Sequence, residues 1–235
     1  KICVLNDKFK IIKSFNFETS KLYNKNYFKI IIKNKLNKNI NSILLFSSVV
    51  PLAFKHLKKN LKSTKFKLFE IKEFALRKII NINVKNKTQI GSDRIANAIG
   101  VKHYNNCLIL DFGTATTFDV IRNGVYEGGV IAPGVKLSMM NLSNSTALLP
   151  IIKLKKNQKT YGKNTKEALN AGFVWGYEGL INNIINKIIL KNKIRYKIIL
   201  TGGYARFFKK VIKRKISIDE DITIKGIAKV YKEFI

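Results

Sequence analysis

The stretch Cys107-Leu-Ile-Leu-Asp-Phe-Gly-Thr-Ala-Thr-Thr-Phe-Asp119 joins an apolar run to a carboxylate, a glycine and several hydroxyls. Its apolar residues predict a buried strand that ends at Asp111. Beyond the strand, Gly113 would let backbone N–H groups approach a phosphate, and Thr114 and Thr116 offer hydroxyl groups. Asp111 could hold a cation that offsets the phosphate charge. The nine residues from Asp111 onward therefore favour a phosphate-and-cation site over an ordinary turn.

Strands and helices alternate through the rest of the sequence. Before the quoted stretch, the patterns predict strands over residues 1–5, 9–17, 42–46 and 66–71, and helices over 21–38 and 52–61. After it, they predict a strand over 116–122, a type I′ turn at Asn123-Gly124, a loop over 128–134 and a helix to 142. A helix over 165–189, a strand over 196–200 and further helices to 235 complete a layered α/β pattern.

Two further glycine turns carry polar residues. Gly91-Ser-Asp-Arg94 opens a helix, which Ser92 or Asp93 could cap while Arg94 stays in solvent. Alternatively, Asp93 could act as a general base toward a hydroxyl, and Arg94 could grip an anionic group. Thr201-Gly-Gly203 follows a strand and could let a flat ring or a ribose lie against the backbone. With the turn after Asp111, these features suggest a nucleotide cleft between two α/β halves.

The long predicted helix carries small residues on one face, at Ala168, Gly172, Gly176 and Gly179. Each glycine inside a helix costs about 1 kcal/mol relative to alanine, so a close backbone approach is expected in return. That approach could come from within the chain or from a second subunit, and the sequence leaves both alternatives open.

The composition excludes a disordered tail, because 46% of the 235 residues are hydrophobic. The net charge of +31 would ordinarily suggest a nucleic-acid partner. However, only 6 of the 45 basic residues are arginine, the residue that best matches phosphate geometry. Charges also nearly cancel between Gly91 and Gly134. A solvated, lysine-rich surface is therefore favoured over nucleic-acid binding.

The two cysteines, Cys3 and Cys107, match no metal or redox spacing and lie in apolar surroundings. We expect buried thiols in a reducing compartment. The longest apolar run, 43–54, is too short and too polar to span a membrane, and the sequence opens with no secretory signal pattern. The sequence predicts a cytoplasmic protein with no zinc site.

Seven blocks resemble, in the same order, those of the type III pantothenate kinase family: Ser47-Ser-Val-Val-Pro51, Gly91-Ser-Asp-Arg-Ile-Ala-Asn97, Asp111-Phe-Gly-Thr-Ala-Thr-Thr-Phe-Asp119, Gly128-Gly-Val-Ile-Ala-Pro-Gly134, Thr146-Ala-Leu-Leu-Pro150, Gly162-Lys-Asn-Thr165 and Thr201-Gly-Gly203. The resemblance implies an actin-like fold of two ribonuclease-H-like α/β domains, residues 1–104 and 105–235, with a nucleotide cleft between them. It also implies a homodimer that uses ATP and Mg²⁺ to phosphorylate pantothenate, the first step of coenzyme A biosynthesis.

The resemblance also assigns roles to single residues. Asp93 resembles the catalytic base, and the substrate site would include Gly91, Ser92, Arg94 and Thr165. Asp111 resembles the ligand of a monovalent cation, potassium or ammonium. The residues that resemble the ATP site are Gly113, Thr114, Gly202 and Gly203.

The sequence departs from the family pattern in three places. The family's first phosphate loop, Asp-x-Gly-Asn-Thr, would lie upstream of Lys1, so roughly a dozen residues are expected to be lacking there. Two alternatives stay open: the true start lies upstream, or the protein is truncated and impaired in ATP binding. Val84 stands where many members have tyrosine, and Lys87 replaces a usual proline. Ser145 stands where the family often has His or Arg. These departures bear on ATP binding and substrate affinity more than on the fold.

The sequence also has features that two other functions would use. A catalytically impaired relative could act as a DNA-binding or transcription accessory protein, which the charge of +31 would suit. The retained blocks at Asp93 and Asp111 argue against it, because a pure binder needs neither a base nor a cation ligand. A sugar or acetate kinase of the same superfamily is disfavoured by the run from Asp111 to Gly134.

Overall fold

The computed structural model describes residues 1–15, 24, 43–62, 66–156 and 160–235. These residues form two compact units, each built from more than one segment. The first unit comprises Lys1–Ile79, Asn86–Gly100 and Thr223–Ile235, and the second comprises Ile80–Lys85 and Val101–Ile222. The domain division after residue 104 stays a prediction, and the compact units differ from it because the C-terminal helix groups with the first unit.

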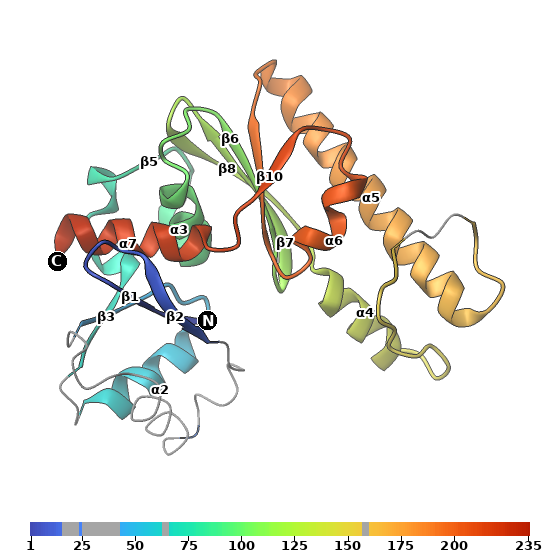
Figure 1. Cartoon of the computed structure of the whole chain (residues 1–235), viewed down its shortest axis with the longest axis horizontal. Coiled ribbons are helices and arrows are strands. Elements are labelled where there is room, and N and C mark those ends of the chain that lie inside the picture. Colours follow the sequence, from blue (N-terminus) through green and yellow to red (C-terminus); the bar gives the residue numbers. More distant parts are fainter. Residues whose placement is uncertain (16–23, 25–42, 63–65, 157–159) are drawn as a thin grey trace. The chain divides into compact units, whose positions relative to one another are not determined.

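A six-stranded sheet forms the centre of the second unit, with the strand order β10-β9-β6-β7-β8-β5 (Figure 1). The strands are β5 (Asn81–Ile82), β6 (Cys107–Phe112), β7 (Ala115–Arg122), β8 (Val125–Pro133), β9 (Lys197–Gly202) and β10 (Ile216–Ile218). The strand β6 pairs antiparallel with β7 and parallel with β9. The carboxyl ends of β6 and β9 therefore meet at one edge of the sheet.

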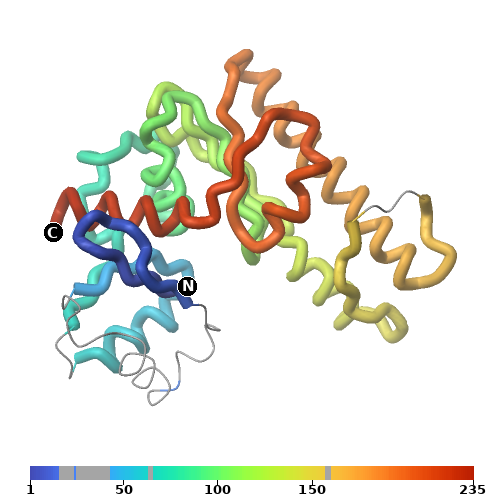
Figure 2. Tube along the Cα trace, viewed as in Figure 1, coloured from blue at the N-terminus to red at the C-terminus, as the bar shows by residue number. Residues whose placement is uncertain are grey.

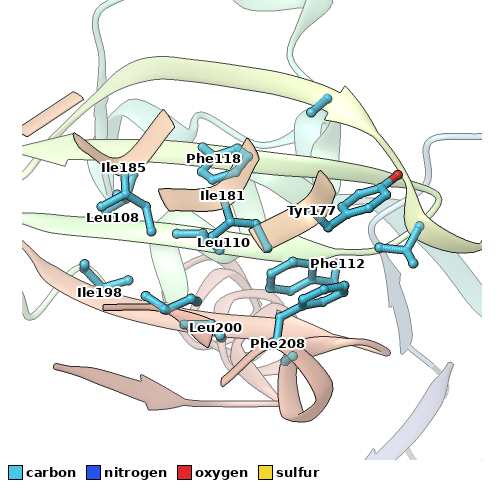
Figure 3. Close-up of a cluster of buried hydrophobic side chains, with 14 of the residues drawn as sticks. Leu108, Leu110, Phe112, Phe118, Tyr177, Ile181, Ile185, Ile198, Leu200 and Phe208 are labelled. Carbon is cyan, nitrogen blue, oxygen red and sulfur yellow. The ribbon is translucent and has the colours of Figure 1, made fainter. Parts of the chain in front are cut away.

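One face of this sheet is covered by apolar side chains from the long helix α5 (Thr165–Asn192). Figure 3 shows Tyr177, Ile181 and Ile185 of this helix lying over the buried residues of β6, β7 and β9. Strand alternation selects Leu108, Leu110 and Phe112 for this core. The rest of the unit contains α4 (Val135–Asn144), α6 (Ala205–Phe208) and the short 3₁₀ helix η5 (Lys209–Val211).

The first unit holds two pairs of strands. The strands β1 (Ile2–Leu5) and β2 (Ile11–Phe15) form an antiparallel hairpin, and β3 (Ile43–Phe46) pairs parallel with β4 (Lys67–Glu70). The helices are α2 (Pro51–Leu61), α3 (Ser92–Gly100) and α7 (Ile222–Phe234), with 3₁₀ turns η2 (Ile71–Glu73), η3 (Leu76–Lys78) and η4 (Lys87–Gln89). The hairpin turn lies beside α7 (Figure 2). The rings of Phe9 in this turn and Tyr231 of α7 pack edge to face, with their centroids 6.0 Å apart.

Most predicted elements are confirmed within a few residues of their expected ends. The turn at Asn123-Gly124 is of the expected type, because both residues have positive φ, 51° and 74°. The predicted helix over 21–38 lies outside the described residues, apart from residue 24, as do residues 16 and 17 of the second predicted strand.

Three structural predictions were wrong. Residues 128–133 continue β8 instead of forming a loop, because Gly129 lies opposite Asp119 at an irregularity in the β7–β8 pairing that accommodates glycine. The strands β5 and β10 were missed, since they have only 2 and 3 residues. Cys3 is only partly buried, whereas Cys107 is fully buried, and burial raises the pKa of the Cys107 thiol to about 12.

The C-terminal helix α7 holds the helix α3 by hydrogen bonds within the first unit. The Thr223 hydroxyl donates to Oδ1 of the buried Asn97 at 2.6 Å. Lys229 Nζ donates to the carbonyl oxygens of Ile99 and Gly100 at 3.2 and 3.0 Å, at the carboxyl end of α3. Lysine at this end also complements the helix dipole.

The crossing of these helices requires glycine at position 226. A Cβ there would lie 1.8 Å from the Ala96 carbonyl oxygen, which is backbone and cannot rotate away. We expect Gly226→Ala to lower the free energy of unfolding by about 1–3 kcal/mol, as overpacking does. The control Lys232→Ala changes an exposed position of the same helix, and we expect it to change the free energy of unfolding by less than about 0.5 kcal/mol. Urea unfolding of both variants measures this, and equal stability would contradict the account.

Candidate functional site

The block Gly91-Ser-Asp-Arg94 forms the start of α3, as predicted. The hydroxyl of the buried Ser92 donates to the Ser48 carbonyl oxygen at 2.7 Å, so it anchors the helix start to the segment after β3. Asp93 Oδ1 accepts the backbone N–H of Arg94 at 2.7 Å. Arg94 is half-buried, so the alternative that left its side chain in solvent is wrong.

Gly91 leaves room for the Asp93 carboxylate. A Cβ at position 91 would lie 2.6 Å from Asp93 Oδ1 and 3.4 Å from Val49 Cγ1. Because the carboxylate is the more movable of these groups, any side chain at position 91 would push it aside. The glycine thus fixes where the acidic group can lie.

A second group of predicted site residues lies around Asp111, where the parallel strands β6 and β9 end side by side. Asp111 pairs in register with Thr117 of β7 and Thr201 of β9, so the three side chains share one face of the sheet. Gly202 has φ +84°, and a Cβ there would lie 2.6 Å from Asp111 Oδ1 and from the Phe112 backbone. The structure therefore brings Asp111 and Gly202 into contact, as a shared site requires.

The turn between β6 and β7 completes this cluster. Gly113 donates its N–H to the Ala115 carbonyl oxygen at 3.1 Å, and Gly113 and Thr114 are exposed. A Cβ at Gly134 would lie 1.8 Å from the Thr114 carbonyl oxygen, so that turn packs directly on Gly134. Gly203 donates its N–H to the Phe112 carbonyl oxygen at 3.1 Å, which joins the second glycine turn to the first.

One predicted hydroxyl is in the wrong place for a ligand. Thr116 is 0% exposed and lies on the face of β7 that carries Phe118, toward the apolar core. The expectation that Thr116 offers a hydroxyl to a phosphate is wrong, because strand alternation turns it inward. Thr117 and Thr201 lie on the Asp111 face instead, and the same alternation, applied to the sequence, could have found them.

Thr165 lies at the first position of α5, where local contacts hold the helix start. The Asn164 side chain caps the helix by accepting the Glu167 N–H at 3.0 Å, and Glu167 Oε2 accepts the Lys163 N–H at 2.9 Å. A Cβ at Gly162 would lie 2.1 Å from the Ala168 nitrogen, so the preceding loop packs tightly on this turn. The position of Thr165 is therefore well determined.

Thr165 also lines an apolar groove of about 670 Å³ along α5. Its lining residues include Ala168, Gly172 and Gly176, and a Cβ at Gly172, Gly176 or Gly179 would meet no described atom within 4 Å. Tyr177 donates to the Pro133 carbonyl oxygen at 3.1 Å and lies 3.0 Å from Ser138 Oγ. Burial raises the pKa of Tyr177, so its phenol stays neutral at this surface.

No group of three or more His, Cys, Asp and Glu side chains that could hold a metal occurs in the described part of the chain. None of the helices in the described ranges combines the length and apolar character needed to cross a membrane. A cation at Asp111 would therefore need ligands from backbone, hydroxyl groups or a bound phosphate in addition to this carboxylate.

Comparisons with known proteins identify the family. The model of the type III pantothenate kinase family matches residues 1–187. The chain is 49% identical over 230 residues to a type III pantothenate kinase of Pelagibacter ubique, covering 97% of this chain and 92% of that protein. It is 36% identical over 193 residues to one from Maricaulis maris, covering 80% and 74% of the two chains.

Two solved structures share the fold. One is described as a Baf family transcriptional activator from Campylobacter jejuni, with TM-score 0.56, 22% identity, and 83% and 84% of the chains covered. The other is the ethanolamine utilization protein EutJ from Carboxydothermus hydrogenoformans, with TM-score 0.51, 14% identity, and 93% and 78% covered. At these identities the likeness shows the fold alone, and it confirms the expected two-domain, actin-like α/β class. With a family model that spans most of its length, the chain belongs to the type III pantothenate kinase family.

Proposed function

We propose that this protein transfers the γ-phosphoryl group of ATP to the primary hydroxyl of pantothenate, giving 4′-phosphopantothenate and ADP. This is the first step of coenzyme A biosynthesis. The observation that carries the proposal is the 49% identity, over 97% of the chain, to a protein named type III pantothenate kinase. The geometry supports it, since Asp93 Oδ1 accepts the Arg94 N–H at the start of α3 and a glycine turn packs against the Asp111 carboxylate.

Asp93 acts as the general base in this proposal. It takes the proton of the pantothenate hydroxyl as that oxygen forms its bond to the γ-phosphorus and the bond from phosphorus to the leaving ADP oxygen breaks. Gly91 leaves room for the Asp93 carboxylate, and Ser92 anchors the start of α3. The Arg94 guanidinium would bind the carboxylate of pantothenate. Catalysis then depends on positioning and charge neutralisation, as in other phosphoryl transfers.

The cluster at Asp111 binds ATP and a monovalent cation. The residues fit such a cation, because the Asp111 carboxylate lies directly against the Gly202 backbone, where a Cβ would come within 2.6 Å of Oδ1. Gly113 and Thr114 would contact the phosphates, and Gly202 with Gly203 would border the adenosine. The cation, potassium or ammonium, supplies positive charge against the phosphates, and Mg²⁺ travels with ATP and needs few protein ligands.

Thr165 would contact pantothenate, and the groove beside it would bind a second copy of the chain. The exposed glycine faces of α5 allow a partner helix to approach closely, and no described part of this chain fills that space. The exposed apolar side chains of α4 and α5 include Leu142, which lines the groove, and also Leu137 and Trp175. A homodimer would bury them. We further propose a cytoplasmic location, which suits two free thiols.

The role of Asp93 predicts the effect of one substitution. We expect Asp93→Asn to keep the fold, since the amide oxygen can still accept the Arg94 N–H, but to lower kcat about 100-fold or more. Pantothenate phosphorylation coupled to ADP release measures kcat, and thermal unfolding checks the fold.

The matched control is Asp7→Asn, which removes an exposed carboxylate from the β1–β2 turn of the same unit. We expect it to have wild-type kinetics. Full activity of Asp93→Asn would refute the assignment of the base, and absence of pantothenate turnover by the wild-type protein would refute the proposed function.

The dimer proposal predicts the effect of filling the groove. We expect Gly176→Leu to give monomers, because the added side chain occupies the space that a partner helix needs. The control Asn183→Leu adds the same side chain at an exposed position of α5 that does not line the groove. Light scattering after size-exclusion chromatography measures the mass. A monomeric wild type, or a dimeric Gly176→Leu, would contradict the proposal.

A further inference from the structure

A closed circuit of hydrogen bonds surrounds the start of α3. It runs from Ser48 through Glu70 and Lys72 to Ile90, and returns to Ser48 through Ser92. Nothing in the sequence motifs singles out Glu70 or Lys72, and neither residue belongs to the blocks that define the family resemblance.

The Glu70 carboxylate makes the first two links. Glu70 is the last residue of β4, and its Oε1 accepts the Ser48 N–H at 3.5 Å while its Oε2 accepts the Lys72 N–H at 2.6 Å. The parallel register pairs Phe46 with Glu70, so the segment after β3 and the segment after β4 leave the sheet side by side. The Glu70 carboxylate thus links the segment that follows β3 to the segment that follows β4.

The Lys72 ammonium makes the next links. Its Nζ donates to the carbonyl oxygens of Thr88 and Ile90, each at 2.9 Å. These carbonyls belong to the loop that ends immediately before Gly91. Hydrogen bonds from a charged donor are stronger than those between neutral groups. The exposed Lys72 side chain therefore binds the backbone of the segment before Gly91, whatever side chains that segment carries.

The circuit closes at Ser92, whose hydroxyl donates to the Ser48 carbonyl oxygen at 2.7 Å. The backbone is thus held at Ile90 and again at Ser92, on both sides of Gly91 and directly before Asp93. The space for the Asp93 carboxylate is narrow, since its Oδ1 lies where a Cβ on Gly91 would come within 2.6 Å. A small backbone shift at residue 91 would therefore move the carboxylate.

We infer that Lys72, oriented by Glu70, is a positioning residue that holds the Asp93 carboxylate in line with the hydroxyl of pantothenate. This inference rests on the proposed function for its substrate. A displacement of about 1 Å at a reacting group can cost about 100-fold in rate. Because Lys72 acts only through the backbone that precedes Gly91, its loss lowers kcat and kcat/KM for pantothenate and leaves the KM for ATP unchanged.

The test compares Lys72→Met with Lys58→Met. Lys58 pairs with Glu73 at 3.4 Å on the surface of the same unit, with both side chains about half exposed, 53% and 42%. Its removal costs the same charge without touching the loop before Gly91. We expect Lys72→Met to lower kcat/KM for pantothenate about tenfold, with an unchanged KM for ATP. Lys58→Met keeps wild-type values, and Lys72→Arg, which retains charged donors, recovers most of the loss.

Glu70→Ala and Glu73→Ala form a second matched pair. We expect Glu70→Ala to show the same kinetic split as Lys72→Met, because the lysine loses the carboxylate that orients its backbone. Glu73→Ala, which removes only the surface ion pair, should not. If Lys72→Met and Lys58→Met have equal kcat/KM for pantothenate, or if Lys72→Met loses stability and all kinetic constants together, the inference is overturned.

Hydrogen exchange separates failure of this inference from failure of the proposed function. We expect the backbone amides of residues 91–94 to exchange faster in Lys72→Met than in Lys58→Met, whatever the substrate. If the wild-type protein phosphorylates pantothenate and these amides are unaffected, the positioning role is wrong. If the wild-type protein does not turn over pantothenate, the proposed function fails. Faster exchange in Lys72→Met but not in Lys58→Met would then still show that Lys72 holds the backbone before Asp93.

Discussion

The second unit depends on the strand β6, which is hydrogen-bonded to β7 along one edge and to β9 along the other. Antiparallel pairing with β7 and parallel pairing with β9 fix the strand's register, and alternation then divides its side chains between two faces. Leu108, Leu110 and Phe112 enter the core under α5, while Asp111 lies on the opposite face. The same register brings Gly202 against the Asp111 carboxylate. A single strand thus supplies both part of the apolar core and the carboxylate of Asp111 on the opposite face.

The first unit positions its carboxylate differently. Asp93 lies on a short helix whose start is held by backbone carbonyls and whose far end is fastened by Lys229 of α7. The groups that do this, Glu70 and Lys72 among them, lie far from the block in sequence and use backbone partners. A backbone carbonyl stays in place when its residue's side chain changes. A sequence motif around Asp93 therefore does not reveal Glu70 and Lys72, which hold that segment through its backbone.

This difference explains how much the sequence could predict. The strand 107–112, the Asn123-Gly124 turn and the helix at Ser92 follow from local patterns, and the structure confirms them. The burial of Thr116, and the place of Thr117 on the same face as Asp111, needed strand alternation. The continuation of β8 through Gly128 and Gly129 depends on an irregular pairing with β7, which is tertiary and leaves no local signal. The circuit through Lys72 likewise depends on contacts between distant segments.

The most direct test of the account is the potassium dependence of pantothenate phosphorylation in Gly202→Ala and Gly203→Ala. A methyl group at position 202 would lie 2.6 Å from the Asp111 carboxylate on a backbone with positive φ, whereas one at position 203 would meet no described atom within 4 Å. The account predicts that Gly203→Ala keeps the wild-type potassium dependence, while Gly202→Ala needs far more potassium or loses activity. Equal potassium dependence in the two variants would contradict it.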